Sequence, residues 1–336
     1  MITYSTFQDN DCPEVSVIVP CYNHEKYLKD SLDSLFSQKD ISLELLFCDD
    51  CSKDGSYSLL EQLLKDADIP VMLMKNEENR GVSFTLNQLL KETRGRLIKV
   101  IASDDMIAEG GIRKMADALK ASPNDQVLIT NGYRVREESR YGHVMKKDLI
   151  YREAPDLSGD LFLRIAENNF LFAPGAMYRR EVFEKYGCFD ESLRMEDFEF
   201  WLRLSRAKVG FVYLSEPLIY YRESGESLSS VENNPRLEQR RISAHLAEMA
   251  SLEKHRDAAE RTVYSKILLR RLAGEKRLAA SRGMKELESI LKKELKSVLK
   301  TPGVSQKSRL YYRLLFLKHD LKSMRHRRKP LREEGA

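Results

Sequence analysis

Residues 15–23 of the chain read VSVIVPCYN. Apart from one serine, the first five of these residues are β-branched and apolar, a composition typical of a strand buried on both faces of a sheet. Pro20 ends the run, and Tyr22 and Asn23 follow in a turn-like segment. The segment therefore predicts a central strand whose carboxyl end carries a polar turn.

Further apolar runs of strand length follow at residues 43–47, 71–74, 97–101 and 127–130. Helical periodicity separates these runs, for example at residues 27–36. Alternation of strands and helices at this spacing predicts right-handed crossovers and an α/β fold with a mostly parallel sheet. We expect this domain to occupy residues 1–232 and its ligands to bind beyond the carboxyl ends of the strands.

The segment after the second predicted strand, residues 49–56, reads DDCSKDGS. An aspartate fixed at a strand end can accept a hydrogen bond from the N–H of a nucleobase. Ser52 or Asp54 can instead cap the helix that follows. Capping explains the serine, aspartate and glycine of this loop, but it leaves the adjacent carboxylates of Asp49 and Asp50 unexplained.

A second acid pair, Asp104 and Asp105, follows the predicted strand at residues 97–101. Paired carboxylates on a rigid strand end can hold a divalent metal ion, which in turn neutralises phosphates. The alternative for Asp105 is the N-cap of a helix near residues 111–119. The sequence leaves both interpretations open.

Glu196 and Asp197 form a third acid pair, at the start of a predicted helix whose buried face carries Phe198, Trp201 and Leu202. Acidic side chains in a first helical turn are favoured by the helix dipole, which is a sufficient structural explanation. A carboxylate held at a helix N-terminus is also well placed to accept a proton from a substrate hydroxyl.

The composition describes an ordinary globular protein of 336 residues, with 42% hydrophobic residues, 32% charged residues and a net charge of +4. No apolar run approaches the roughly 20 residues that cross a bilayer. The first residues lack the basic start and apolar core of a secretory signal. We therefore expect a cytoplasmic protein.

Residues 233–336 are rich in Leu, Ala, Glu, Lys and Arg and predict a helical C-terminal region. We expect it to pack on the first domain, to form a homodimer, or to contact a membrane peripherally. Basic residues crowd its end, at positions such as Lys318, Lys322 and Arg325. They suit the anionic inner face of a cell membrane or nucleic acid, and a solvated helix end is the alternative.

Five cysteines are scattered along the chain, an arrangement that makes a poor disulfide framework. Cys48 and Cys51 form a C-x-x-C pair, which invites a redox or zinc interpretation. A structural zinc site needs two further ligands at comparable spacing, and the sequence offers no second pair. Cys48 ends an apolar run, so a buried strand position is the better interpretation.

Taken in order, these segments resemble the family 2 glycosyltransferases, which have the GT-A fold. The likeness spans about residues 15–230, and one motif alone would be weak. The segments that carry it are VSVIVPCYN (15–23), DDCSKDGS (49–56), NRGVSFTLN (79–87), RLIKVIASDD (96–105), APG (173–175), MEDFEFWLRL (195–204) and PLIYYR (217–222).

The resemblance implies a role for each site residue. Pro20, Tyr22, Asn23 and Asp50 would form the pocket for the nucleotide base, with uracil favoured. Asp104 and Asp105 would fill the ribose and metal positions, the metal being Mn²⁺ or Mg²⁺. Arg80 and Arg222 would contact the diphosphate. Asp197 would be the general base, with Glu196 as its less favoured rival.

The chain departs from the family pattern at two positions. Many members carry an aspartate where this chain has Ala102, so a metal site would rest on Asp104 and Asp105. A histidine is common directly after the tyrosine and arginine at positions 221 and 222, where this chain has Glu223. The second departure puts a phosphate contact from that loop in doubt.

The resemblance implies an inverting, metal-assisted transfer of sugar from a nucleotide diphosphate, UDP favoured, to a hydroxyl of a glycan, glycolipid or glycoprotein. Acceptor contacts are expected within residues 132–174, and no nucleic acid is expected as a partner. The alternative is an inactive nucleotide-sugar-binding or scaffolding protein of the same fold. An oxidoreductase is disfavoured because G-x-G-x-x-G is absent after the first strand. A hydrolase that uses the same acids stays open.

Overall fold

The computed structural model describes residues 1–8, 13–193 and 196–223. The chain divides into two units, Met1–Asn234 and Pro235–Ala336, and the described residues all belong to the first. The predicted helical region at residues 233–336, with its basic end, lies outside the described residues. No helix in the described ranges combines the length and apolar character that a membrane span requires.

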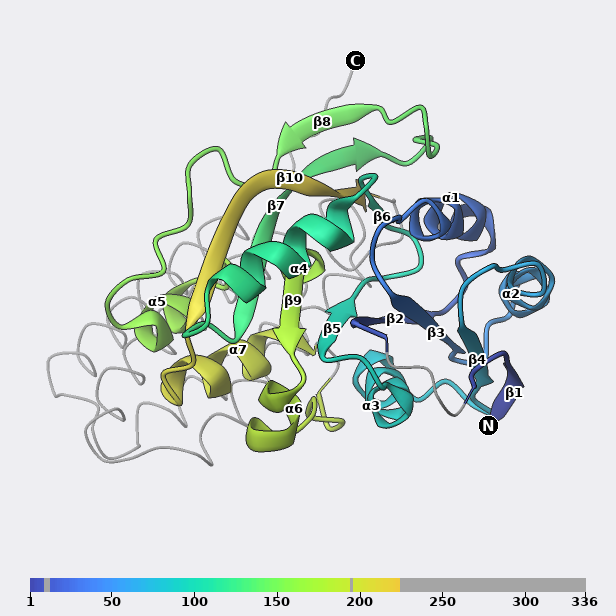
Figure 1. Cartoon of the computed structure of the whole chain (residues 1–336), viewed down its shortest axis with the longest axis horizontal. Helices are drawn as coiled ribbons and strands as arrows, with labels where there is room; N and C mark the ends of the chain where they lie inside the picture. Colours follow the sequence, from blue (N-terminus) through green and yellow to red (C-terminus); the bar gives the residue numbers. More distant parts are fainter. Residues whose placement is uncertain (9–12, 194–195, 224–336) are drawn as a thin grey trace, which may run out of the picture. The chain divides into compact units, whose positions relative to one another are not determined.

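The core of the fold is a ten-stranded sheet with the order β1-β4-β3-β2-β5-β9-β7-β10-β6, in which β8 pairs with β7 (Figure 1). The strands are β1 (Ile2–Ser5), β2 (Val15–Cys21), β3 (Leu43–Asp49), β4 (Val71–Lys75), β5 (Leu97–Val100), β6 (Met106–Ile107), β7 (Val127–Arg136), β8 (Lys146–Leu149), β9 (Ala176–Arg179) and β10 (Phe211–Glu223). The helices are α1 (Glu25–Phe36), α2 (Ser56–Leu64), α3 (Val82–Glu92), α4 (Gly111–Ala121), α5 (Leu161–Glu167), η1 (Ala173–Gly175), α6 (Glu181–Tyr186) and α7 (Asp197–Arg206).

The predicted α/β fold with a mostly parallel sheet is confirmed. Strands β4, β3, β2 and β5 run parallel to one another, and β10 runs parallel to β7. The antiparallel strand β9 joins these two groups, because it pairs with both β5 and β7. All six parallel strands therefore point the same way, and their carboxyl ends meet at one edge of the sheet.

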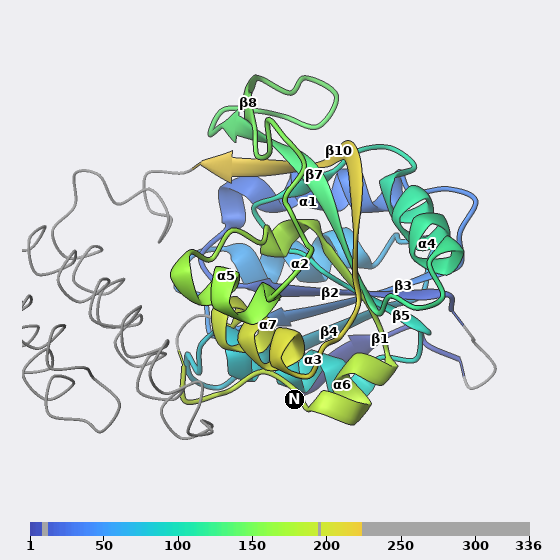
Figure 2. The same ribbon diagram turned by 90° about the vertical axis from the view of Figure 1, so that its left-hand side faces the viewer.

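Strand β2 is central because both of its faces are covered. Val15, Val17, Ile18 and Val19 have no exposed surface. Helices α1 and α2 lie on one side of the sheet here and α3 lies on the other (Figure 2). Burying one such side chain contributes roughly 1.5–3 kcal/mol, so the apolar run at the start of the chain holds this part of the sheet together.

An aromatic cluster fixes helix α7. Phe200 and Trp201 are fully buried, and the Trp201 ring stacks on the ring of Tyr178 in β9 at 5.7 Å between centroids. Phe200 stacks on Phe183 of α6 at 5.3 Å. The buried face predicted from the sequence is confirmed, since Phe198, Trp201 and Leu202 are all buried. This packing determines where the acidic N-terminus of α7 lies.

Candidate functional site

The turn after β2 is locked to the loop after β3. Asn23 has a left-handed backbone with φ of 56°, a conformation that asparagine tolerates better than most residues. Its side-chain oxygen accepts a hydrogen bond from the N–H of Lys53 at 2.7 Å, and its own N–H donates to the Ser52 hydroxyl at 2.9 Å. Tyr22 is 39% exposed, so this rigid turn presents an aromatic ring at the edge of the sheet.

Asp50 organises the loop between β4 and α3. Its carboxylate is 4% exposed and accepts hydrogen bonds from the Asn76 amide at 2.8 Å, the Arg80 N–H at 2.9 Å and the Gly81 N–H at 2.8 Å. Gly81 has a φ of 88°, where a side chain would be strained. A carboxylate offers about four acceptor positions, and these donors use three of those of Asp50.

Residues of the loop between β3 and α2 form hydrogen bonds with the start of α1 as well as with the start of α2. The Asp54 carboxylate accepts hydrogen bonds from the Ser56 N–H at 3.0 Å and from the Glu25 N–H at 3.1 Å. The residue at the N-cap of α2 is Gly55, whose N–H donates to the Glu25 carboxylate at 2.8 Å. The loop after β3 and the start of α1 therefore form one connected unit beneath Tyr22.

Cys48 and Cys51 are free thiols on this strand end. Burial raises the pKa of Cys48 to about 12, which keeps it protonated and unreactive at neutral pH. Cys51 has a φ of 62°, and its thiol lies 3.4 Å from the backbone oxygen of Glu77. The buried strand position predicted for Cys48 is therefore confirmed, and Cys51 lies in a tight turn.

Asp104 and Asp105 lie at the end of β5, but they differ in exposure. The Asp104 side chain is 14% exposed, and its carboxylate lies 3.9 Å from Nδ1 of His24. Asp105 is 1% exposed, and its Oδ1 accepts a hydrogen bond from the N–H of Arg222 at 2.9 Å. Gly110 occupies the N-cap of α4, so the capping interpretation of Asp105 is wrong.

The second carboxylate oxygen of Asp105 is buried and has no hydrogen-bond partner. Burial, and then the charge of Asp104, raise the pKa of Asp105 well above its ordinary value, while the N–H of Arg222 acts in the opposite direction. A cation held between the two acids would satisfy this oxygen. No group of three potential metal-ligating side chains occurs in the described part of the chain. Two carboxylates are nevertheless enough for Mg²⁺, which takes its remaining ligands from substrate phosphates and water.

Lys99 is a buried residue of the site region that sequence reasoning did not identify. Its ammonium has no exposed surface and donates hydrogen bonds to the backbone oxygens of Val100 at 2.7 Å, Pro174 at 2.5 Å and Ala176 at 3.2 Å. These bonds attach η1 to the end of β5. A lysine inside the apolar run at residues 97–101 was the signal that could have revealed it.

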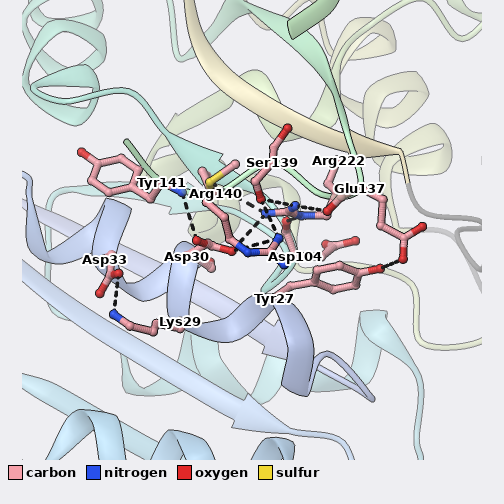
Figure 3. A network of polar contacts seen from close by, with 12 residues as sticks. Tyr27, Lys29, Asp30, Asp33, Asp104, Glu137, Ser139, Arg140, Tyr141 and Arg222 are labelled. Atoms are coloured by element: carbon pink, nitrogen blue, oxygen red, sulfur yellow. Dashed lines mark hydrogen bonds and ion pairs between the residues drawn. The ribbon is translucent and has the colours of Figure 1, made fainter. Parts of the chain in front are cut away.

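The two arginines expected at the diphosphate have different environments. The Arg80 side chain is 47% exposed, with its guanidinium 4.0 Å from the ring centroid of Phe84. Arg222 has no exposed surface, and its guanidinium donates to the backbone oxygens of Asp104 and Ser139 at 2.8 and 2.7 Å (Figure 3). The expected contact between Arg222 and a diphosphate does not fit this geometry, because the donors face the protein interior.

Asp197 is the first residue of α7 and Glu196 precedes it at the N-cap. The amide of Asn169 donates a hydrogen bond to Oδ2 of Asp197 at 3.0 Å. Burial raises the pKa of the Tyr178 hydroxyl, and the charges of Glu196 and Asp197 raise it further. Sequence reasoning did not identify Asn169, since nothing in the sequence around it indicates a partner 28 residues away.

Asn169 connects Asp197 to the same edge of the sheet. It precedes η1, which Lys99 binds to the end of β5. Figure 2 shows the carboxyl end of β10 and helix α5 on the same side of the molecule. The structure therefore brings the turn after β2, Asp50, Arg80 and the pair Asp104 and Asp105 to one sheet edge, and it places Asp197 in the segments that border this edge.

The model of the family described as "Glycosyl transferase family 2" matches residues 16–187, just over half of the chain. The chain belongs to this family. The matched residues include the turn after β2, the loops after β3 and β4, and the pair Asp104 and Asp105, but they end before Asp197 and Arg222.

Named relatives agree with the family assignment. The chain is 28% identical over 244 residues to EpsJ of Bacillus subtilis, an uncharacterized glycosyltransferase, covering 71% of this chain and 69% of EpsJ. Relatives in the same range are also named glycosyltransferases. The chain is accordingly a glycosyltransferase.

Solved structures share the fold. TarS 1–349 of S. aureus, solved in complex with UDP-GlcNAc, has a TM-score of 0.61 and 20% identity, over 91% of this chain and 88% of TarS. The mannosyltransferase PcManGT of Pyrobaculum calidifontis, solved with GDP-Man and Mn²⁺, has a TM-score of 0.52 and 19% identity, over 93% and 88% of the two chains. At such identities the likeness establishes the GT-A fold and nothing finer.

Proposed function

We propose that this glycosyltransferase moves a sugar from a nucleotide diphosphate, UDP favoured, to a hydroxyl of a glycan, glycolipid or glycoprotein, with inversion at the anomeric carbon. One observation carries the proposal. An exposed aromatic ring at Tyr22, the buried acceptor Asp50 and the acid pair Asp104 and Asp105 stand at the ends of adjacent strands.

The nucleotide base would lie against Tyr22, in the pocket bordered by Pro20 and Asn23. The remaining acceptor position of Asp50 would take a base N–H, since its other positions hold the loop that ends at Gly81. The exposed guanidinium of Arg80, on the same loop, would approach the diphosphate. The complex of TarS with UDP-GlcNAc, a protein of the same fold, supports a UDP-sugar donor.

Asp104 and Asp105 would hold Mn²⁺ or Mg²⁺, with the ribose beside Asp104. The unpaired buried oxygen of Asp105 supports this assignment, as does the Mn²⁺ in the PcManGT structure. Such an ion stabilises the negative charge that grows on the departing diphosphate. Lys99 would hold η1 at the end of β5 while the sugar is transferred from the diphosphate to the acceptor.

Asp197 would accept the proton of the acceptor hydroxyl as that oxygen attacks the anomeric carbon opposite the diphosphate. The hydrogen bond from Asn169 holds one carboxylate oxygen and orients the other. We place the acceptor along residues 132–174, which include Asn169. Glu196 is the alternative base, because it precedes Asp197 directly.

A donor panel tests the proposal. Purified full-length protein is incubated with UDP-, GDP- and dTDP-sugars with Mn²⁺, Mg²⁺ or chelator, and nucleotide release is measured with and without candidate acceptors. We expect release that depends on the metal ion and is accelerated by an acceptor. Release that no acceptor accelerates would identify a hydrolase, and absence of any nucleotide binding would identify an inactive scaffold.

The Asp197→Asn variant tests the base assignment. General-base catalysis contributes about 10²- to 10⁴-fold, so we expect a loss of turnover in this range with nucleotide affinity retained. Glu196→Gln serves as the matched control and is expected to lose much less activity. A larger loss in the control than in Asp197→Asn would transfer the base role to Glu196.

For residues 233–336 we propose one of three roles: a packing element, a dimer interface or a peripheral contact with an anionic membrane. Co-sedimentation of the full chain with anionic and neutral vesicles distinguishes the last of these. We expect binding to anionic vesicles only, and a loss of binding when Lys318, Lys322 and Arg325 are replaced by glutamine. Equal sedimentation with both vesicle types would contradict the electrostatic contact.

A further inference from the structure

Arg222 holds both members of the second acid pair at once. Its backbone N–H donates to Oδ1 of Asp105 at 2.9 Å. Its side-chain Nε donates to the backbone oxygen of Asp104 at 2.8 Å. Both bonds come from one residue near the end of β10, so a shift of this residue would move Asp104 and Asp105 together.

The same guanidinium is anchored on its other side to two further elements (Figure 3). Nη1 donates to the backbone oxygens of Glu137 at 2.5 Å and Ser139 at 2.7 Å, in the turn after β7. Nη2 lies 3.8 Å from the carboxylate of Asp30 on α1. A guanidinium presents its donors in a rigid planar fork, so these contacts define its orientation closely.

Glu137 closes the connection between the turn after β7 and α1. Its carboxylate accepts hydrogen bonds from the Tyr27 hydroxyl and from the ammonium of Lys26, both at 2.7 Å. The Tyr27 ring also lies under the guanidinium of Arg222, 4.9 Å from its carbon to the ring centroid. Helix α1, the turn after β7 and the end of β10 thus form one frame around the acid pair.

We propose that Arg222 is a positioning residue that holds Asp104 and Asp105 in the geometry needed to bind a metal-bound nucleotide diphosphate. The inference rests on the proposed function. With no exposed surface, Arg222 does not touch the substrate and acts through the two acids. The rigid fork fixes the backbone of Asp104 and of the turn after β7, and with them the position of the Arg222 N–H that holds Asp105.

A purely structural role makes a different prediction. Loss of a buried, fully bonded arginine would then weaken the whole fold, and every ligand would be affected alike. A positioning role predicts a selective loss, since the contacts of Arg222 reach the acid pair after β5 and none of them reaches Tyr22 or Asp50. Nucleotide binding without metal therefore separates the two roles.

The test compares two probes on the full-length protein and its Arg222→Lys and Arg222→Met variants. The wild type is first titrated with UDP, GDP and dTDP in the presence of Mn²⁺ to find the nucleotide that binds. The first probe is this diphosphate with Mn²⁺. The second probe is the monophosphate of the same nucleoside with chelator. We expect both variants to bind the metal-bound diphosphate about 10- to 100-fold more weakly. Their affinity for the monophosphate should stay within about twofold of the wild type, because its pocket is unchanged.

Lys29→Ala is the matched control, because Lys29 lies on the same helix and its exposed ammonium forms an ion pair with Asp33 at 2.7 Å (Figure 3). We expect it to bind both probes as the wild type does. Should Arg222→Lys fail to fold, Tyr27→Phe replaces it, since it removes the hydroxyl that contacts Glu137 and Lys26 and keeps the ring under the guanidinium. A selective loss of diphosphate affinity in Tyr27→Phe supports the inference, and unchanged affinity overturns it.

Equal losses for both probes, or no loss for either, would overturn the positioning role of Arg222. A wild type that binds none of the three nucleotides would instead overturn the proposed function. The two failures are therefore distinguishable in one experiment.

Discussion

Two acid pairs stand on either side of β2, one after β3 and one after β5, and the protein surrounds them differently. Asp50, in the first pair, accepts three hydrogen bonds from Asn76, Arg80 and Gly81. Asp105, in the second, accepts one, and its other oxygen is buried without a partner. The Asp50 carboxylate thus has three partners within the protein and Asp105 has one, whereas Oδ2 of Asp49, like Oδ2 of Asp105, is buried without a partner.

The physical reason for the difference is the cost of burying charge. An ionised carboxylate is stable in the interior when hydrogen bonds or opposite charges replace the water it loses. The loop between β4 and α3 supplies them to Asp50. Asp105 sits beside another acid instead, and burial together with Asp104 raises its pKa. Similar sequence patterns thus have different surroundings, because a loop supplies donors to Asp50 and a second acid lies beside Asp105.

Replacing Asp105 by asparagine should have the largest effect on activity. Metal stabilisation of a leaving group contributes several kcal/mol, and each 1.4 kcal/mol is tenfold, so turnover should fall roughly 100- to 1000-fold. The free energy of unfolding without metal should stay the same or increase, because an incompletely paired buried carboxylate is removed. Initial rates and urea unfolding with and without Mn²⁺ measure both quantities.

The wild type should gain stability from Mn²⁺ with nucleotide, while Asp105→Asn should not, because a ligand stabilises only the state that binds it. An Asp105→Asn variant that retains full turnover would contradict the proposal that the second acid pair, unlike the first, binds the metal ion. A variant that loses stability without metal would show that Asp105 also stabilises the fold, as we expect of Asp50.

The Asp50→Asn variant should show the opposite pattern, with a clear loss of stability. Asparagine offers one oxygen to three donors and points an N–H at the others. Hydrogen bonds to charged groups contribute about 1.5–3 kcal/mol each, so we expect the free energy of unfolding to fall by at least about 2 kcal/mol. Urea unfolding measures it, with Asp66→Asn at an exposed position as the control. A loss no larger than that of the control would contradict the role of Asp50 in the loop.

The smallest effect should come from Lys99, which binds η1 to the strand of the second pair. Burial lowers the pKa of Lys99 to about 7, from 10.5 in an unfolded chain. Between these values the unfolded state binds more protons, so the contribution of Lys99 to stability rises with pH. From pH 7 to pH 8 the wild type should gain about 1 kcal/mol relative to Lys99→Met, since one proton changes stability by up to about 1.4 kcal/mol per pH unit.

Urea unfolding at several pH values between 6 and 8.5 checks this difference. Lys39→Met, at an exposed position, is the control and should follow the wild type at every pH. A parallel pH dependence of the wild type and Lys99→Met would mean that Lys99 stays charged throughout, held by its three backbone acceptors.

Much of the site was predictable because parallel strands obey a simple geometry. The apolar runs at residues 15–19, 43–47 and 97–101 indicated strands, and the residues after each run had to meet at one edge. That rule alone puts Tyr22, Asp50 and Asp104 at this edge, whereas their expected roles came from the family resemblance. Their sequence neighbours carried enough information, because strands and the turns that end them are local structures.

The roles of three residues could not be predicted from their sequence neighbours. They are Arg222, Lys99 and Asn169. Arg222 looked like a phosphate ligand because it lies near the site in the family pattern, yet β10 turns its side chain into the interior. Asn169 became a partner of Asp197 only because the aromatic packing of α7 brings residues 28 positions apart into contact. Such roles depend on side-chain direction and on contacts between distant segments.

From the order of its residues alone, the chain indicates the strands at residues 15–19, 43–47, 71–74, 97–101 and 127–130, their parallel arrangement and the acids at their ends, because periodicity and turn chemistry act over a few residues. The tertiary structure decides which of those acids accepts hydrogen bonds from the protein and which keeps an oxygen without a partner. It also decides which basic side chain points into the interior. The reason is physical: burial and hydrogen-bond partners belong to contacts between segments far apart in the chain, and charge is tolerated or costly according to those contacts.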